Sequence, residues 1–137
     1  MTLKNFMMAG IMAITIPAVA HAEDMSWVKH EQNYSEVLKN PHANELDTGI
    51  KKITQNDYSL VNGLLHEEGF NTSVVNNIAY IRGCKLGMCM NFASIAFDGN
   101  GNYWGYMENM DKNYKTYHKI YGHPSPEVLK ILKGPEH

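Results

Sequence analysis

Long apolar runs and clusters of basic side chains are both missing from most of this sequence. Beyond residue 22 no stretch approaches the ~20 apolar residues that a membrane-spanning helix needs, so we expect no membrane span. No run of lysine or arginine occurs anywhere and the net charge is −2, so nucleic acid is not an expected partner. Internal repeats and low-complexity tracts are absent as well, so the organisation of the chain has to be read from local patterns.

Motifs for enzymatic chemistry are also missing. The sequence has no G-x-S-x-G, no H-E-x-x-H and no phosphate-binding glycine loop. His66, which two glutamates follow, fits the solvated last turn of a helix. His118 fits a residue in a sheet and His123 fits a turn. An acid–base group formed by these two histidines and Glu127 stays open as an alternative. We therefore expect that the protein is not an enzyme and that it uses no cofactor.

The first 22 residues have the features of an export signal. Lys4 precedes an apolar run over residues 6–19, and the run ends in Ala20-His21-Ala22, an A-x-A-type cleavage site. Cleavage after Ala22 would leave residues 23–137, which have a net charge of −3 and fit one small domain. We expect a periplasmic protein without a lipoprotein anchor, because no cysteine lies at the cleavage site.

Export determines the expected oxidation state of the only two cysteines, Cys84 and Cys89. In an oxidising compartment a disulfide persists, and two cysteines this close in sequence are expected to pair. Because so short a loop has little entropy to lose, the bridge stabilises the fold by only ~2 kcal/mol, and its larger effect is to fix a local shape. The residues that the loop encloses are Lys85, Leu86, Gly87 and Met88.

Period-two patterns around this loop predict a sheet. Residues 78–82 read as a strand that leads into the loop, and residues 92–97 read as its partner. The turn at residues 98–101, Asp-Gly-Asn-Gly, predicts a hairpin return over residues 103–107, because glycine and asparagine tolerate the positive φ that tight hairpins require. A further strand is expected over residues 114–121.

Helix signals occur in the sequence both before and after these strands. A short helix is expected over residues 35–40, and a second helix is expected to begin at Thr54 and to end at Gly69. Ser125 is a good N-cap for a third helix that ends at Gly134. Together these elements predict an α+β fold, with an antiparallel meander of four to five strands, two to three helices packed on one side, and a protruding disulfide-closed loop.

The tip of the loop has two interpretations. One is a structural staple on a β-hairpin. The other is a contact with a protein partner, because Leu86 and Met88 are apolar residues on a protrusion that should be exposed, beside the cation Lys85. The second interpretation gives the loop residues a function in binding.

A larger pattern contains this loop. Tyr80-Ile81-Arg82-Gly83-Cys84-Lys85, three variable residues and Cys89 are followed by the apolar strand around Ile95-Ala96-Phe97 and by the return Tyr103-Trp104-Gly105-Tyr106-Met107. This pattern resembles the inhibitor of vertebrate lysozyme (Ivy) family of bacterial periplasmic proteins. The resemblance implies an antiparallel sheet flanked by helices, from which a disulfide loop protrudes into the active-site cleft of a c-type lysozyme.

Three loop positions depart from the family pattern. The typical loop is Cys-Lys-Pro-His-Asp-Cys, whose histidine meets the carboxylates of the lysozyme cleft, whereas Leu86, Gly87 and Met88 occupy the variable positions here. Lys85 would still reach an acidic cleft, and Leu86 and Met88 would fill an apolar subsite. The sequence therefore predicts a protein inhibitor of a lysozyme or another peptidoglycan hydrolase. Its predicted contact residues are Lys85, Leu86, Gly87 and Met88.

Two alternative functions stay open. A divergent loop fits an immunity or binding protein for a different secreted toxin. Reduced cysteines together with Met88, Met90, Met107 and Met110 would offer soft ligands that suit Cu(I), so periplasmic copper binding is the other alternative. Methionines also fill irregular core gaps, and we assign no metal site to these residues. The sequence leaves the formation of a homodimer open.

Overall fold

The computed structural model describes residues 23–67, 69–85 and 87–134. The expected signal peptide, residues 1–22, lies outside the described residues, as do residues 68, 86 and 135–137. None of the helices in the described ranges is both long enough and apolar enough to cross a membrane.

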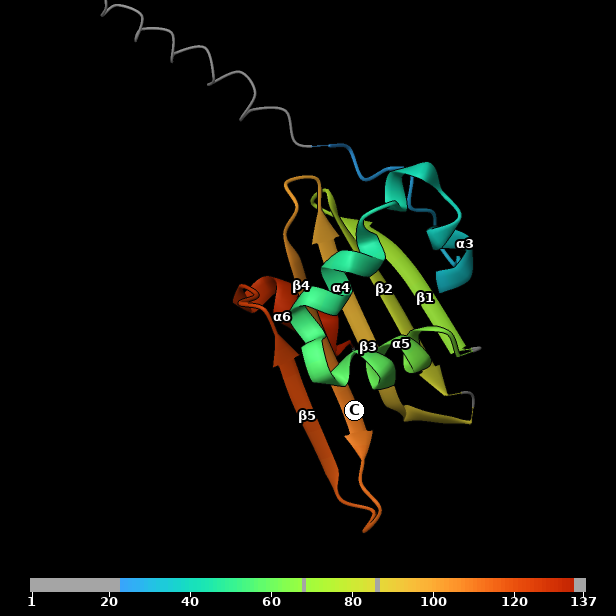
Figure 1. The fold of residues 1–137 in the computed structure, drawn as a ribbon, viewed down its shortest axis with the longest axis vertical. Helices are drawn as coiled ribbons and strands as arrows, with labels where there is room; N and C mark the ends of the chain where they lie inside the picture. Colours follow the sequence, from blue (N-terminus) through green and yellow to red (C-terminus); the bar gives the residue numbers. More distant parts are fainter. Residues whose placement is uncertain (1–22, 68, 86, 135–137) are drawn as a thin grey trace, which may run out of the picture.

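Within the described residues, five strands form one antiparallel sheet in sequence order (Figure 1). Each strand pairs with the next one along the chain, so the sheet is a meander. The α+β class and the expected meander are therefore confirmed. The strands are β1 (Gly69–Val75), β2 (Ile78–Lys85), β3 (Met88–Asp98), β4 (Tyr103–Met110) and β5 (Thr116–Tyr121).

Strand β1 is one of two main elements that the sequence patterns do not predict, and the helix over residues 46–54 is the other. Gly69 is expected to end a helix, but in the structure it is the first residue of β1. The signal for this strand is the pair Asn76 and Asn77, which links Val75 to its partner Ile78 with φ values of 52° and 59°. Asparagine tolerates positive φ better than most residues, so two asparagines in a row form the tight turn of a two-residue hairpin.

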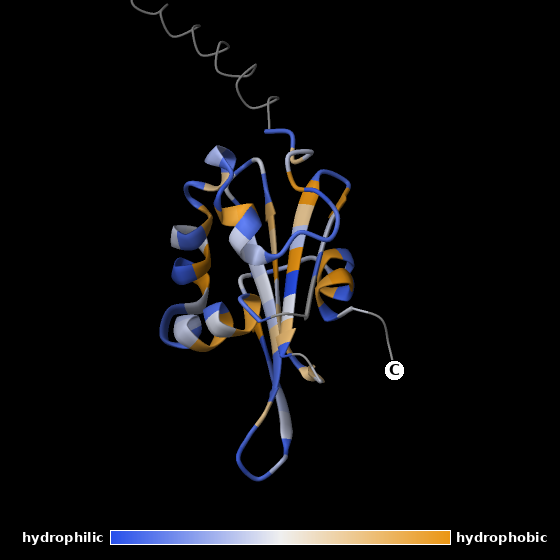
Figure 2. Ribbon diagram, turned by 90° about the vertical axis from the view of Figure 1, so that its right-hand side faces the viewer, coloured by the Kyte–Doolittle hydropathy of each residue, from blue (hydrophilic) through white to orange (hydrophobic). Residues whose placement is uncertain are grey.

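The helices lie on both faces of the sheet (Figure 2). The chain before the sheet forms α3 (Tyr34–Leu38), η2 (Pro41–Ala43), α4 (Leu46–Thr54), η3 (Gln55–Asp57) and α5 (Tyr58–Leu65), and α6 (Pro126–Lys133) follows the sheet. Helices α4 and α5 share one hydrophobic core with the sheet, whereas α6 packs in a separate core on the opposite face. The expectation that all helices pack on one side is therefore wrong.

Strand β3 shows why helices must cover both faces of the sheet. All its side chains from residue 92 to residue 97 are buried. Ala93, Ile95 and Phe97 belong to the core with α4 and α5, and Phe92 and Ala96 belong to the core with α6. A strand that is covered on both faces reads as a continuous apolar run instead of an alternating one. The run therefore requires a helix on each side of the sheet.

The boundaries of two helices follow local hydrogen bonds. Thr54 is expected to start a helix, but it is the last residue of α4, and its hydroxyl donates to the carbonyl of Ile50 at 2.7 Å. Helix α6 begins as expected, because the Ser125 hydroxyl accepts a hydrogen bond from the Val128 N–H at 3.2 Å. Gly134 follows the last turn with a φ of 80°, which favours glycine.

A glycine in each layer lets the first helices approach the sheet closely. A Cβ at Gly49 in α4 would collide with the ring of Tyr103 in β4. A Cβ at Gly83 in β2 would collide with the carbonyl oxygen of Leu64 in α5. Any side chain at either position would push the layers apart, so both glycines fix the position of β2 and β4 under the helices.

Candidate functional site

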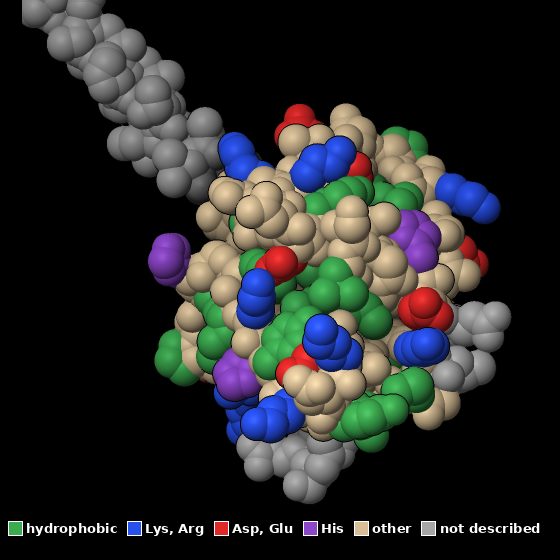
Figure 3. All heavy atoms as spheres, turned by 60° about the horizontal axis from the view of Figure 1, so that its bottom comes forward, with side chains coloured by type: hydrophobic (Ala, Val, Ile, Leu, Met, Phe, Trp, Pro, Cys, Tyr) green, Lys and Arg blue, Asp and Glu red, His purple; other side chains and the backbone are tan. Residues whose placement is uncertain are grey.

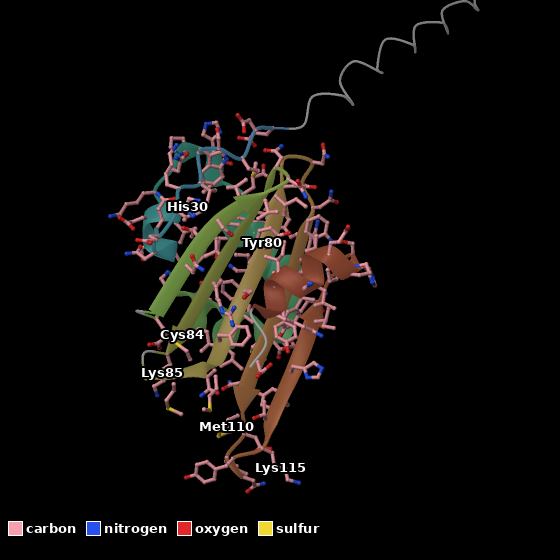
Figure 4. All side chains as sticks on the ribbon, turned by 180° about the vertical axis from the view of Figure 1, so that it is seen from behind. His30, Tyr80, Cys84, Lys85, Met110 and Lys115 are labelled. Carbon is pink, nitrogen blue, oxygen red and sulfur yellow. A yellow bond between two sulfur atoms is a disulfide. The ribbon has the colours of Figure 1, made fainter. Side chains whose placement is uncertain are left out.

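A disulfide between Cys84 and Cys89 joins the end of β2 to the start of β3 (Figure 4). We call the segment from Cys84 to Cys89 the disulfide tip. The bridge confirms the expected pairing and its place between two strands. Because both sulfurs belong to the bridge, neither cysteine offers a thiolate to a metal ion in this structure.

Strand pairing continues beyond the disulfide. Lys85 pairs with Met88, and Gly87 lies in the turn between them with a φ of 84°. Below this pair the register shifts, because the next pair is Cys84 with Phe92, which leaves Cys89 and its two successors bulged out of β3. A bulge of this kind twists and bends a hairpin, and here the disulfide ties its first residue, Cys89, to Cys84 on the paired strand.

The base of the disulfide tip is anchored and its end is open. Cys84 is only 7% exposed and packs with Phe92 in the core under α6. Met88 is 40% exposed and Met90 is 55% exposed, although both are large apolar side chains. Exposed methionines on a braced hairpin offer an adaptable apolar surface to another molecule.

The structure places three of the four predicted contact residues. Lys85 and Met88 are exposed and lie opposite each other across the turn, and Gly87 is exposed at the turn itself. Leu86 lies outside the described residues. The tip therefore presents a cation and a thioether from neighbouring positions.

A second protrusion, the β4–β5 hairpin, extends from the same end of the sheet (Figure 4). Its turn contains Tyr114, which has a φ of 63° and is 83% exposed. The Asp111 carboxylate shapes this turn by accepting hydrogen bonds from the N–H groups of Asn113 at 2.8 Å and Lys115 at 2.9 Å. The sequence patterns predict Tyr114 inside a strand and so miss its position at a tip. Viewed toward this end, the molecule shows hydrophobic side chains interspersed with charged ones (Figure 3).

The β4–β5 hairpin is tied to the helical layer through Asp57. The Asp57 carboxylate lies 2.8 Å from the ammonium of Lys119 and accepts a hydrogen bond from the Tyr121 hydroxyl at 2.9 Å. The hydrogen bond from Lys119, followed by that from Tyr121, lowers the pKa of Asp57 below its ordinary value of 3.8. Burial, followed by the hydrogen bond to Asp57, raises the pKa of Tyr121. A charged carboxylate therefore links β5 to the helical layer.

Three of the residues considered for copper binding or catalysis lie in separate places. Met107 is buried in the core with α4 and α5, so it is not part of the exposed tip. Nδ1 of His66 lies 2.9 Å from the carbonyl oxygen of Asn62 at the end of α5, and His118 stacks on Tyr106. Among the described residues, no three histidine, cysteine, aspartate or glutamate side chains form a group that could hold a metal ion.

Comparison of the chain with protein-family models, with curated proteins and with solved structures finds no match. The interpretation of the disulfide tip therefore rests on its own geometry and on the pattern of residues around Cys84 and Cys89.

Proposed function

We propose that this chain is a divergent Ivy-like inhibitor, exported to the periplasm, which inserts its disulfide tip into the active-site cleft of a lysozyme or a related peptidoglycan hydrolase. The observation that carries the proposal is the pair of Lys85 and Met88, which are both exposed and face each other across a disulfide-braced turn. Such a tip has the narrow shape and the mixed apolar and cationic chemistry that a polysaccharide cleft would accept.

Lys85 supplies the electrostatic part of the inhibition. Glycoside hydrolases cleave with a pair of carboxyl groups that flank the scissile bond. An ammonium that enters this cleft forms charge-assisted hydrogen bonds with those carboxylates and occupies the position of the substrate. Lys85 matches the lysine of the typical family loop, whereas Gly87 stands at the position of its histidine, so on this proposal Lys85 alone supplies the contact with the cleft carboxylates.

Met88 supplies the apolar part, and the disulfide lowers the cost of binding. A methionine side chain adapts to an irregular subsite because it is unbranched and polarizable. The Cys84–Cys89 bridge removes most of the conformational freedom of the tip before the partner arrives. A segment that is already ordered loses less entropy on binding, so more of its contact energy appears as affinity.

The β4–β5 hairpin would enlarge the interface. Stable protein–protein interfaces bury about 1,200 Å² or more, which exceeds what one short tip covers. Tyr114 is exposed at the same end of the sheet, and tyrosine is enriched in interfaces because it combines an apolar ring with a hydrogen-bonding hydroxyl. On this proposal Tyr114 contacts the rim of the cleft while Lys85 and Met88 enter it.

Calorimetric titration with c-type lysozyme, together with turbidimetric lysis of cell walls, tests the proposal. The protein should be purified from the periplasm of an expression host so that the disulfide forms. We expect saturable binding and loss of lysis, and Lys85→Glu should weaken binding about tenfold or more because it places a like charge against the cleft carboxylates. The matched control is Lys52→Glu on α4, which makes the same charge change at an exposed site away from the tip.

Absence of binding, or equal weakening by Lys85→Glu and Lys52→Glu, would contradict inhibition of lysozyme through this tip. A specific observation favours a second function in that case. The loop lacks the histidine and aspartate of the typical family loop and carries Leu86, Gly87 and Met88 instead. An immunity protein for a secreted toxin would use the same surface, and its interaction with the toxin would be lost in Lys85→Glu.

A further inference from the structure

A pocket of about 370 Å³ lies on the sheet face that α6 covers. Helix α6 packs over β3 and β4 and shares a core with Tyr80 and Cys84 of β2. The β1 part of this face is less covered, because Asn71 is exposed and Ser73 is half-buried. Figure 4 looks onto this face and labels Tyr80, one of the lining residues, next to α6. The volume falls in the range of small-molecule sites, which is about 300–1,000 Å³.

A polar row crosses the sheet at the floor of this pocket. Asn71 in β1 is directly opposite Arg82 in β2, and Arg82 is directly opposite Ser94 in β3. Residues opposite each other in antiparallel strands point to the same face, so all three side chains lie on the α6 side. All three residues line the pocket. The next row on this face, which contains Tyr80 and Ala96, is largely apolar and buried.

Arg82 is held in place without a salt bridge among the described residues. Burial lowers the pKa of Arg82, and the charge of the nearby Glu108 carboxylate opposes this shift. The guanidinium of Arg82 lies 3.8 Å from the ring centroid of Phe92, and Nη2 donates to the carbonyl of Lys133 at 3.4 Å. It also packs against Gly134, where a Cβ would collide with Nη1. Only one of the five N–H donors of Arg82 has an acceptor among the described residues. A half-buried cation in this state is suited to receive an anion.

Ser94 adds an unsatisfied hydroxyl beside this cation. Ser94 is only 3% exposed, and its Oγ has no hydrogen-bond partner among the described residues. A buried polar group without a partner destabilises the fold, and a ligand oxygen at this position would satisfy it. Lys130 on α6 brings a second positive charge, and the lining residues that the structure describes include no carboxylate.

We propose that this pocket binds a small amphiphilic anion, in which a carboxylate or phosphate head group meets Arg82 and Ser94 and an apolar body lies against Leu132 and Ile131 of α6. Arginine pairs with either head group through parallel charge-assisted hydrogen bonds. The proposal does not depend on hydrolase inhibition, because the pocket lies on one face of the sheet whereas the disulfide tip lies at its end.

The first test is a titration of the ¹⁵N-labelled protein followed by amide chemical shifts. Octanoate and octyl phosphate are the two anionic probes, and octanamide is the uncharged match. With at least one anionic probe we expect saturable shifts at Asn71, Arg82, Ser94 and the last turn of α6. Octanamide should bind at least about tenfold more weakly than that probe. The stronger of the two anions identifies the head group. Equal binding of octanamide, or no saturable shift at these residues with either anion, would overturn the proposal.

Three variants assign the contacts. Arg82→Gln should weaken binding of the anion about tenfold or more, because a hydrogen bond to a charged group is lost. Ser94→Ala should weaken binding while the thermal unfolding temperature stays unchanged or rises, because the hydroxyl that it removes has no partner. Lys85→Gln, at the disulfide tip, is the matched loss of a positive charge and should leave binding of the anion unchanged. Unchanged binding in both Arg82→Gln and Ser94→Ala would overturn the assignment.

Discussion

Two hairpins protrude from the same end of the sheet, and they are held by different chemistry. The β2–β3 hairpin is closed by the Cys84–Cys89 disulfide, whereas the β4–β5 hairpin is tied to the helices through the Asp57 carboxylate. A covalent bridge depends on the redox state of the solution and an ionic contact depends on pH. The comparison indicates that the disulfide tip is built to keep one shape, while the β4–β5 hairpin is joined to the helices through a contact that depends on charge.

The largest expected effect comes from removing the covalent brace. The double variant Cys84→Ser and Cys89→Ser should lower the free energy of unfolding by about 2 kcal/mol, because the unfolded chain regains the freedom that the short loop had lost. Urea unfolding of the oxidised wild type and the variant measures this difference. Amide hydrogen exchange should speed up at the disulfide tip and stay unchanged in β5. Equal acceleration in both hairpins would contradict their independence.

A smaller effect is expected from the turn of the disulfide tip. Gly87 has a φ of 84°, so Gly87→Ala should lower the free energy of unfolding by about 1.5 kcal/mol through backbone strain. Gly63→Ala is the matched control, because Gly63 lies in helix α5 and a Cβ added there would meet no atom within 4 Å. That substitution should stabilise the protein by about 0.5–1 kcal/mol. Thermal unfolding of both variants distinguishes strain from a general effect of alanine.

Acid should loosen the second hairpin. The pKa of Asp57 is lowered in the folded protein, so its contribution to stability is present above the unfolded value of 3.8 and is lost as the pH falls through the folded pKa. Asp57→Asn should lower the free energy of unfolding by about 1 kcal/mol near neutral pH, and this difference should disappear in acid. Urea unfolding across the acid range checks the prediction, and a difference that persists at the lowest pH would contradict it.

The smallest effect on stability is expected at the end of the second hairpin. Tyr114 is 83% exposed, so Tyr114→Ser should change the free energy of unfolding by no more than about 0.5 kcal/mol. A larger loss would mean that the tyrosine packs against the protein instead of facing a partner. Urea unfolding of the variant and of the wild type measures this difference in the free energy of unfolding.

Much of the fold can be predicted because local signals agree with the tertiary structure. The Asp98 turn is one example, since its carboxylate accepts hydrogen bonds from the N–H groups of Asn100 and Asn102 at 3.0 Å each. Strand β1 was missed because its hairpin turn is formed by Asn76 and Asn77, and asparagine is a weaker sequence signal for positive φ than glycine. The continuous apolar run in β3 indicates that both faces of the sheet are covered, but the run alone does not say which helix covers which face.

The candidate site was predicted only in part. The short spacing of Cys84 and Cys89 is a local signal, so the disulfide tip followed from the sequence. The polar row of Arg82 and Ser94 depends on strand register, which brings together residues that are far apart in the chain. The exposure of Tyr114 depends on where β4 and β5 end, because Tyr114 lies in the turn between them. No local pattern marks them, because each residue alone is ordinary on a strand or in a turn.

The most direct test compares one apolar residue on each hairpin. The affinity for c-type lysozyme should be measured by calorimetry for Met88→Asp and for Tyr114→Asp, with the wild type as reference. We expect that Met88→Asp weakens binding about thirtyfold, as for a residue buried at the centre of an interface, and that Tyr114→Asp weakens it by about threefold or less. An equal loss in both variants, or a larger loss in Tyr114→Asp, would contradict the proposal that the disulfide tip enters the cleft.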